Sequence, residues 1–428
     1  MKLCVVLSCL PVTLILAGCG EAHESTREVS SVGDPWKLVL APVPGPTPLD
    51  ERIATLQRRI PSLEDPTVLL EQLGSLFIVK ARSTYDPGFY RLAELCAVCI
   101  EGRDADATSA KLLRGHVAHS LHRFVEAEDI AQELVARRGN FHDFGLLGDV
   151  QLDRGDLDAA LASYQKMADL KPCLQSYARA ARLCWLRGDL EGARELFRMA
   201  KGAGSVRAPE ALAWTYGQLA EVELQAGDVP AAKAACDAAL ALMGNAAPAL
   251  LVRARIAGME DRHDAALRDL RLAAVANPLP EYQWALADQL RRVGQDGEAE
   301  AVEAELERRG AREDPRTFAL YLASRGRRVA DALRLTAQEL EARQDVHTWD
   351  ARAWALLRAG RAAEAWQAMQ KALGEGTADA RLYYHAGAIA KATGLDDEGR
   401  RYLDDADELR RMLLPMEQRD LAALRRAH

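Results

Sequence analysis

Aromatic residues and basic stretches are both scarce in this chain, and each scarcity limits the kinds of fold and partner that the chain can have. Phe, Trp and Tyr make up 6% of the 428 residues, whereas hydrophobic residues of all kinds make up 49%. Ala and Leu therefore do most of the packing, which is typical of helices stacked with closely spaced backbones. The formal net charge is −8 and is spread along the chain, with no basic stretch suited to neutralising phosphates. We therefore expect no nucleic-acid partner.

Motifs of catalysis are also missing from the sequence. The chain has no G-x-S-x-G nucleophile elbow, no H-E-x-x-H zinc motif, no G-x-x-x-x-G-K phosphate loop and no dinucleotide-binding glycine fingerprint. Acidic pairs such as Asp396-Asp397 fall on predicted turn or helix surfaces, where carboxylates are solvated. The sequence therefore predicts a protein that is not an enzyme and that holds no cofactor or metal.

Cysteines beyond residue 19 are few, and their number is odd. Cys96 and Cys99 are three residues apart on a predicted helix, without the strand–loop–helix context of a redox motif. This pattern favours free thiols in a helical core. The five residues concerned are Cys96, Cys99, Cys173, Cys184 and Cys236.

The chain does contain a small residue at a near-constant interval. The successive spacings are 33, 33, 39, 34, 33, 33, 33 and 34 residues. Self-similarity at this period marks a solenoid of helical hairpins, in which each unit packs on its neighbours. Such folds build long binding surfaces and seldom carry chemistry, so the period predicts an interaction scaffold. The nine positions are Ala127, Ala160, Ala193, Ala232, Ala266, Ala299, Ala332, Ala365 and Gly399.

The unit over residues 141–172 shows the repeat most clearly. Its first predicted helix ends before Gly155, at a position where a left-handed backbone suits glycine. Its second helix places Ala160 and Tyr164 on one face. We expect Gly148 and Ala160 to be small because the two helices approach closely there. The Tyr164 ring is expected to fill the space between hairpins.

This pattern resembles the tetratricopeptide repeat, whose signature is W-x2-L-G-x2-Y, then A-x3-F, then P. The resemblance covers residues 67–413 and implies an all-α fold, a right-handed superhelical α-solenoid of nine to ten helical hairpins. Residues 49–107 are predicted to form N-terminal helices with a degenerate repeat, residues 108–413 the array, and residues 414–428 a capping helix. Glu303 and Thr336 replace an aromatic residue of the signature. The units around them are therefore expected to pack more loosely and to act as a hinge.

The first twenty residues are typical of a secretory targeting segment. Lys2 precedes an apolar stretch over residues 3–17, which is too short for a comfortable membrane-spanning helix. The stretch ends in Leu16-Ala17-Gly18-Cys19, which resembles a bacterial lipoprotein lipobox. The resemblance implies removal of residues 1–18 as a signal peptide and a lipid on Cys19, with acyl chains such as palmitate as the membrane anchor. The alternative is ordinary signal cleavage without lipid.

The segment that follows the lipobox predicts both a location and a tether. Gly20 stands where an Asp would retain the protein in the inner membrane, so the resemblance implies an outer-membrane anchor facing the periplasm if the bacterium has two membranes. Residues 19–48 are rich in Ser, Glu, Gly and Pro. Because proline fixes φ and removes a backbone donor, this segment is predicted to be an extended tether.

The resemblance also implies where a partner would bind. In tetratricopeptide repeats, positions 2, 5, 9 and 12 of each first helix line the concave groove, since spacings of three and four keep them on one helical face. We therefore expect a groove for a peptide or protein partner, with aromatic anchors flanked by charges, as in interface hot spots. The groove residues expected are Asp149, Arg182, Trp185, Trp214, Glu221, Arg255, Trp284, Asp288, Trp354 and Tyr384.

Three other interpretations of these residues remain open. The alternating charges from Asp149 to Asp288 would instead pair as a solvated ladder, each contact worth about 0–1 kcal/mol. His116, His119 and His142 map to groove positions, and imidazoles one turn apart can share a metal ion, which would suit a metal-dependent hydrolase. No carboxylate or thiol is placed in the sequence to complete that set. The third interpretation is a purely structural spacer with an empty groove.

Overall fold

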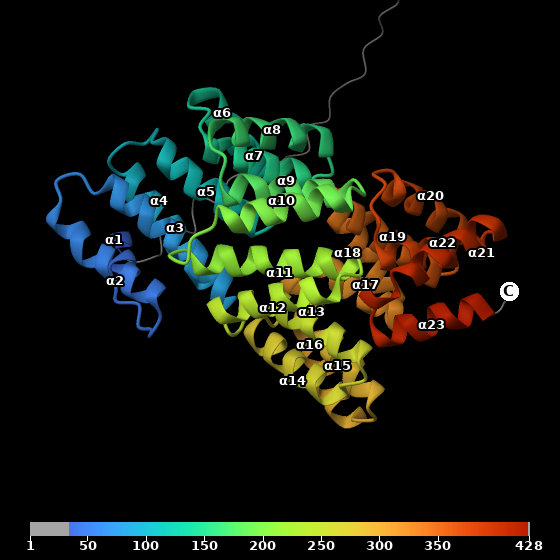
Figure 1. Ribbon diagram of the computed structural model, residues 1–428. Coiled ribbons are helices and arrows are strands. Elements are labelled where there is room, and N and C mark those ends of the chain that lie inside the picture. The colour runs from blue at the N-terminus through green and yellow to red at the C-terminus, as the bar shows by residue number, and fades with distance from the viewer. Residues whose placement is uncertain (1–33, 427–428) are drawn as a thin grey trace, which may run out of the picture.

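The computed structural model describes residues 34–426, and over that range it contains helices and no strands (Figure 1). The predicted signal peptide over residues 1–18 and the predicted lipidation site Cys19 lie outside the described residues. Twenty helices, α3 to α22, pair into ten successive hairpins. This array confirms the predicted all-α solenoid of nine to ten hairpins.

The hairpins differ little in length. Their first helices are α3 (Thr67–Thr84), α5 (Thr108–Ser120), α7 (Phe141–Asp153), α9 (Leu174–Leu186), α11 (Pro209–Gln225), α13 (Ala247–Met259), α15 (Pro280–Arg292), α17 (Pro315–Arg325), α19 (Val346–Arg358) and α21 (Ala380–Ala392). Their second helices are α4 (Gly88–Glu101), α6 (Phe124–Arg137), α8 (Leu157–Leu170), α10 (Leu190–Gly202), α12 (Val229–Leu242), α14 (His263–Ala276), α16 (Asp296–Glu313), α18 (Val329–Ala342), α20 (Ala362–Leu373) and α22 (Asp396–Glu408). The flanking elements are α1 (Pro35–Val39), α2 (Pro48–Arg59), η2 (Ile60–Ser62), η3 (Arg410–Met412) and α23 (Pro415–Arg426).

Three hairpins share a Gly-Asp turn that ends one helix and begins the next. Gly155, Gly188 and Gly227 have φ values of 87°, 75° and 86°, a left-handed conformation that glycine adopts without steric cost. The aspartate after each glycine accepts a hydrogen bond from the backbone N–H three residues on, which caps the second helix. These aspartates are Asp156, Asp189 and Asp228.

Small residues let the two helices of a hairpin approach closely. A Cβ on Gly148 would lie 2.4 Å from the Tyr164 ring, so only glycine leaves room for that ring. Tyr164 is buried, and its hydroxyl donates a hydrogen bond to Asp149 at 2.9 Å. All nine small residues at the repeat interval are buried. The predicted close approach of α7 and α8 is therefore confirmed.

Glu303 and Thr336 are buried, although looser packing was expected where they replace an aromatic residue. The Glu303 carboxylate pairs with Arg291 at 2.7 Å and with Arg325 at 3.0 Å. The Thr336 hydroxyl donates to the Ala332 carbonyl at 2.8 Å. Hydrogen bonds thus replace the aromatic contact at both positions, and the expected loosening does not occur at these side chains.

The second half of the predicted tether is folded against the array. Residues 35–39 form α1, which packs on α4, and Val39 is fully buried. The Gln57 amide of α2 donates to the backbone carbonyls of Val39 and Ala41, at 2.9 and 2.7 Å. These bonds satisfy backbone groups that an extended tether would leave to water. An extended conformation is therefore not what residues 35–41 adopt.

The superhelix curves until its late hairpins contact its early ones (Figure 1). A Cβ on Gly155 would lie 2.4 Å from the Gln344 carbonyl oxygen, and one on Gly188 equally close to that of Gly376. The Thr377 hydroxyl donates to the Leu186 carbonyl. Turns that end α7 and α9 therefore press on loops more than 180 residues further along. This contact encloses the concave groove.

None of the helices within residues 34–426 is both long enough and apolar enough to cross a membrane. The five cysteines in this range are free thiols. Cys96, Cys99 and Cys236 are buried, whereas Cys173 and Cys184 are half-buried. Burial raises the pKa of Cys99 to about 11, so its unreactive thiol form predominates at neutral pH.

Candidate functional site

The concave face encloses a cavity of about 290 Å³. Side chains from seven successive first helices, α9 to α21, form its wall, and Met412 and Leu414 of the C-terminal segment close one side. Because every one of these helices contributes, the cavity exists only once the superhelix has closed. Two tryptophans, Trp185 and Trp284, lie among the polar, charged and aliphatic residues of this wall.

Five of the ten predicted groove residues come together at this cavity. Arg182 and Trp185 reach it from α9, Glu221 from α11, Arg255 from α13 and Trp284 from α15. They were selected only by their position in the repeat. The register of the first helices, read from the sequence, therefore identifies which side chains face inward across these hairpins.

Four further wall residues share a single place in the repeat, the second residue of a first helix. They are Glu281, Arg316, His347 and Arg381. Position 2 belongs to the same set that selected Trp284 at position 5, so the register could have identified all four. They were missed because the register was followed only for the aromatic residues and for the alternating charges at position 9.

Trp185 links the two sides of the closed superhelix. Its indole Nε1 donates to the Gln225 side-chain oxygen at 2.7 Å, and the Gln225 amide donates to the Ala378 carbonyl at 2.5 Å. The Trp185 ring stacks on His347, with centroids 5.9 Å apart. Burial, and then the neighbouring Arg316, lowers the pKa of His347, so a neutral imidazole faces the tryptophan at pH 7.

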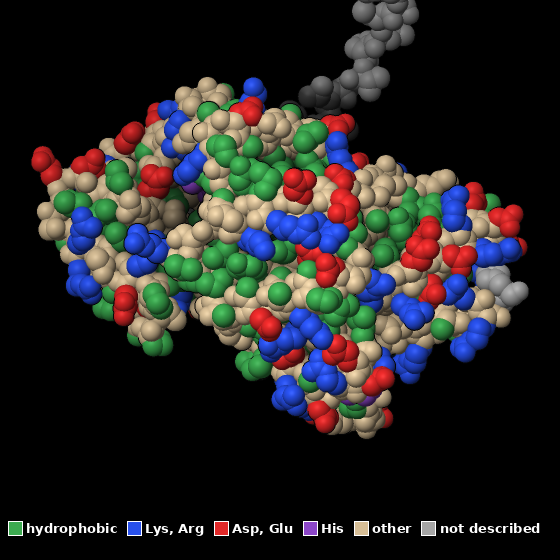
Figure 2. Space-filling model, in the orientation of Figure 1, with side chains coloured by type: hydrophobic (Ala, Val, Ile, Leu, Met, Phe, Trp, Pro, Cys, Tyr) green, Lys and Arg blue, Asp and Glu red, His purple; other side chains and the backbone are tan. Residues whose placement is uncertain are grey.

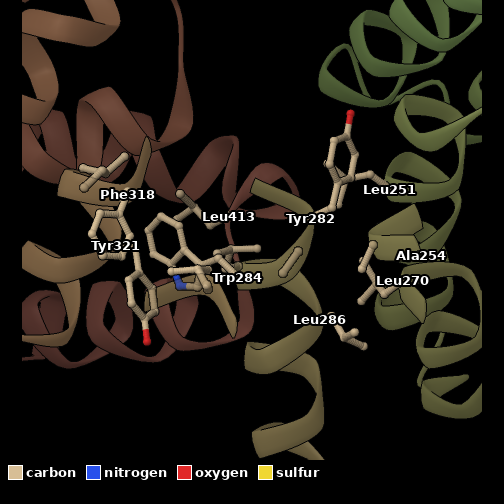
Figure 3. Close-up of a cluster of buried hydrophobic side chains, with 14 of the residues drawn as sticks. Leu251, Ala254, Leu270, Tyr282, Trp284, Leu286, Phe318, Tyr321 and Leu413 are labelled. Atoms are coloured by element: carbon tan, nitrogen blue, oxygen red, sulfur yellow. The ribbon is translucent and has the colours of Figure 1, made fainter. Parts of the chain in front are cut away.

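Trp284 is buried in an aromatic cluster beneath the cavity. Its ring meets Tyr321 edge-on at 5.9 Å, and Figure 3 shows it beside Tyr321 and Leu413. The Arg381 guanidinium lies over the Trp284 ring at 5.0 Å and pairs with Glu417 of α23 at 2.6 Å. Burial by itself would lower the pKa of Arg381. The charge and hydrogen bond of Glu417 have the larger combined effect, so the pKa of Arg381 is raised. Trp284 is thus held as part of the wall.

Two charged groups at the cavity have no partner among residues 34–426. Arg182 forms no ion pair or side-chain hydrogen bond there, and neither does the Glu281 carboxylate. Glu281 is exposed to the cavity, although protein surrounds the cavity on most sides. Loss of solvation there, and then the negative charge of Glu221, raises the pKa of Glu281. Glu221 itself pairs with Arg255 at 3.2 Å. Within the described part of the chain, the cavity therefore presents the Arg182 cation and the Glu281 carboxyl group to a ligand without an ion-pair partner.

Asp149, Trp354 and Tyr384 are absorbed into packing. Asp149 accepts two hydrogen bonds from Arg179, both at 2.7 Å. Trp354 and Tyr384 are buried side by side, with ring centroids 5.5 Å apart. Their positions in the repeat are inward, as expected, but neighbouring hairpins cover them.

Asp288 and Trp214 are the remaining two predicted groove residues. Asp288 is buried and accepts the Met416 backbone N–H at 2.7 Å. Trp214 is 39% exposed and lies outside the cavity wall. Of the predicted charge ladder, only the pair Glu221–Arg255 forms, because Asp149 pairs with Arg179 of α9 instead of with Arg182 of the same helix.

The three histidines of the alternative metal site have other environments. His119 shares a hydrogen bond with Asp153 at 2.9 Å, and His142 packs on Phe141 with centroids 4.1 Å apart. Burial lowers the pKa of His116 to about 3. Across residues 34–426, no three His, Cys, Asp or Glu side chains are grouped as metal ligands. The hydrolase alternative therefore has no metal site in the described part of the chain.

Charges of both signs are intermixed on the face of the molecule shown in Figure 2. The same mixture lines the cavity, where Arg182 and Arg255 lie with Glu221 and Glu281. Such a wall suits a ligand that carries both charge signs and an apolar part. It does not resemble the single-sign surface that binds a polyanion.

No family model matches the chain, and no curated protein is similar to it. Several solved structures match the chain at low similarity. One is yeast Tom70, with 15% identity, 89% of this chain and 92% of that chain covered, and a TM-score of 0.37. Pseudomonas aeruginosa pilF has 17% identity, coverage of 55% and 99%, and a TM-score of 0.40. A tetratricopeptide repeat protein from Parabacteroides merdae has 19% identity, coverage of 59% and 98%, and a TM-score of 0.33.

Proposed function

We propose that this protein is an interaction scaffold whose concave face binds a peptide or a segment of a partner protein. The observation that carries the proposal is the meeting of Arg182, Trp185, Arg255 and Trp284, from three different hairpins, at one cavity. Tryptophans flanked by arginines form the energetic centres of many protein interfaces. Binding would be the whole activity, since a preformed helical array holds these side chains in place and the ligand bears most of the ordering cost.

The free groups at the cavity define the chemistry of the ligand. Arg182 offers a guanidinium without a carboxylate partner, which suits a carboxylate of the ligand. Glu281 offers a carboxyl group, opposite in charge sign to Arg182, and its oxygens suit a backbone N–H or a basic side chain of the ligand. The proposed ligand is therefore a mixed-charge peptide segment with an apolar residue for the Trp185 side of the wall.

The location of the scaffold is part of the proposal. The lipobox-like sequence before Cys19 supports a lipid anchor in the cell envelope, at the outer membrane facing the periplasm in a bacterium with two membranes. Since α1 docks on the array, the tether would comprise the residues between Cys19 and Pro35. The scaffold would then stay close to the membrane surface.

A quantitative pull-down from detergent-solubilised envelopes tests the binding role. The test variant is Arg182→Glu, which reverses a cavity charge that forms no ion pair or side-chain hydrogen bond within residues 34–426. The matched control is Trp214→Ala, which removes an exposed tryptophan outside the cavity. We expect the control to retain partners that the test variant loses, with both variants showing the helical circular dichroism of the wild type. Equal partners for both variants would contradict groove binding and support the spacer interpretation.

A further inference from the structure

The segment that follows the last hairpin crosses the concave face. This strap, residues 409–418, includes η3 and the start of α23. Met412 packs with the hydrophobic residues of α11 and α13, and the buried Leu413 and Leu414 join the cluster around Trp284. A helix that only capped the array would cover the last hairpin, whereas the strap reaches back to hairpins more than 120 residues earlier.

Groove positions of the repeat hold the strap. Asp288, at position 9 of its helix, accepts the Met416 N–H at 2.7 Å. Arg381, at position 2, pairs with Glu417 at 2.6 Å. The second Glu417 oxygen accepts the Leu414 N–H at 2.8 Å, which fixes the turn into α23. The strap therefore uses a backbone donor and a carboxylate on the same positions that a groove ligand would use.

The strap also divides the concave space. A second cavity of about 420 Å³ lies on its other side, between α13, α15 and the strap. Leu251, Arg255, Ala285 and Leu414 line both cavities. Three of these four residues belong to the array and only Leu414 to the strap. Moving Leu414 would therefore join the two cavities into one continuous groove.

We propose that the strap is an intramolecular occupant of the partner-binding groove, and that a partner segment of the same chemistry displaces it. That chemistry is a run of aliphatic side chains followed, within about one helical turn, by a carboxylate for Arg381. The inference rests on the proposed binding role of the concave face. It adds the class of partner segment and makes the strap a competitor.

Competition within one chain has a calculable effect. A partner's apparent Kd equals its Kd for the open groove divided by the fraction of open molecules. If the strap is closed in about 90–99% of molecules, releasing it tightens partner binding by about 10- to 100-fold. A tethered segment reaches an effective concentration of about millimolar, so even a weak strap contact gives such occupancy.

A peptide supplied in trans tests the strap with the full chain. The probe is a fluorescein-labelled synthetic peptide with the sequence of residues 408–421, and its binding is followed by fluorescence anisotropy. Glu417→Arg releases the strap by opposing Arg381 but leaves the groove itself unchanged. Arg425→Ala, on the same helix, removes ion pairs with Asp404 and Asp407 outside the strap and is the matched control.

We expect Glu417→Arg to bind the peptide at least 10-fold more tightly than wild type, and Arg425→Ala to behave as wild type. Equal binding by all three proteins, or binding by none, would overturn the proposal. Hydrogen exchange of the wild type gives an independent readout that needs no variant. Excess unlabelled peptide should speed exchange of the Leu414 and Met416 amides, and unchanged exchange would also overturn the proposal.

The peptide assay contains no cellular partner, so it separates the two proposals. Tighter peptide binding by Glu417→Arg together with a pull-down insensitive to Arg182→Glu would support the strap and contradict the proposed scaffold function. The reverse pattern would keep the scaffold function and reduce the strap to a structural cap. The two proposals can therefore be contradicted independently of each other.

Discussion

Replacing Gly188 with alanine is expected to open the closed superhelix locally. Gly188 has φ 75°, and a Cβ there would lie 2.4 Å from the Gly376 carbonyl oxygen. Gly294 provides a matched control, because it has φ 77° at the corresponding turn of another hairpin and a Cβ there would meet nothing within 4 Å. The two alanine variants thus share the backbone cost and differ in the clash across the superhelix.

The expected magnitudes follow from these contacts. Alanine in a left-handed conformation costs about 1 kcal/mol, and Gly294→Ala should show only this cost. In Gly188→Ala, the Gly376 oxygen must also retreat to 3.0 Å or more, which strains the Thr377–Leu186 and Gln225–Ala378 hydrogen bonds. Each of these is worth about 1 kcal/mol, so Gly188→Ala should cost about 3 kcal/mol in total.

Hydrogen exchange is the suitable assay, since a long repeat array need not unfold in one step. The amides of Gly376 and Asp379 donate within the loop that contacts Gly188. An extra cost of about 2 kcal/mol should speed their exchange about 30-fold in Gly188→Ala relative to Gly294→Ala. Equal exchange of this loop in the two variants would refute the contact between these turns.

Three further predictions concern buried polar groups. Glu303→Ala leaves the buried Arg325 with only the longer contact to Asp288, at 3.5 Å, and should lower the urea unfolding free energy by about 3 kcal/mol; a loss below 1 kcal/mol would contradict the buried pair. Trp185→Phe removes the bond to Gln225 and should speed exchange of the loop over residues 374–379 about fivefold, for a loss of about 1 kcal/mol, whereas an unchanged rate would show that this bond does not hold the loop. Burial raises the pKa of Asp288 to about 6, so its carboxyl is harder to ionise in the folded than in the unfolded protein. The free energy of unfolding should therefore fall as the pH rises from about 4 through 6, by up to about 3 kcal/mol. Urea titrations at several pH values measure this fall, and Asp288→Asn should remove it. The same pH profile for Asp288→Asn and the wild type would contradict the prediction.

The sequence predicted the local structure of the hairpins because short-range chemistry determines it. The repeat interval located the buried small residues, and Gly148 had to be small because Tyr164 lies against it within the same hairpin. The register of the first helices likewise selected Trp284 and Arg255 as inward-facing, since helical geometry fixes which positions share a face. The same register contains Glu281, which was missed only because position 2 was not followed through every unit.

The sequence by itself determined the all-α class, the paired helices and the set of inward-facing positions, because a 33-residue repeat and the Gly-Asp turns act within one hairpin. Only the tertiary structure decided that the groove is enclosed and that the chain's own strap crosses it. Closure depends on small rotations that add up from hairpin to hairpin until Gly188 meets Gly376, and no local pattern records such a sum. The partner of Asp288, the Met416 N–H, is likewise distant in sequence and is brought near only when the array has curved.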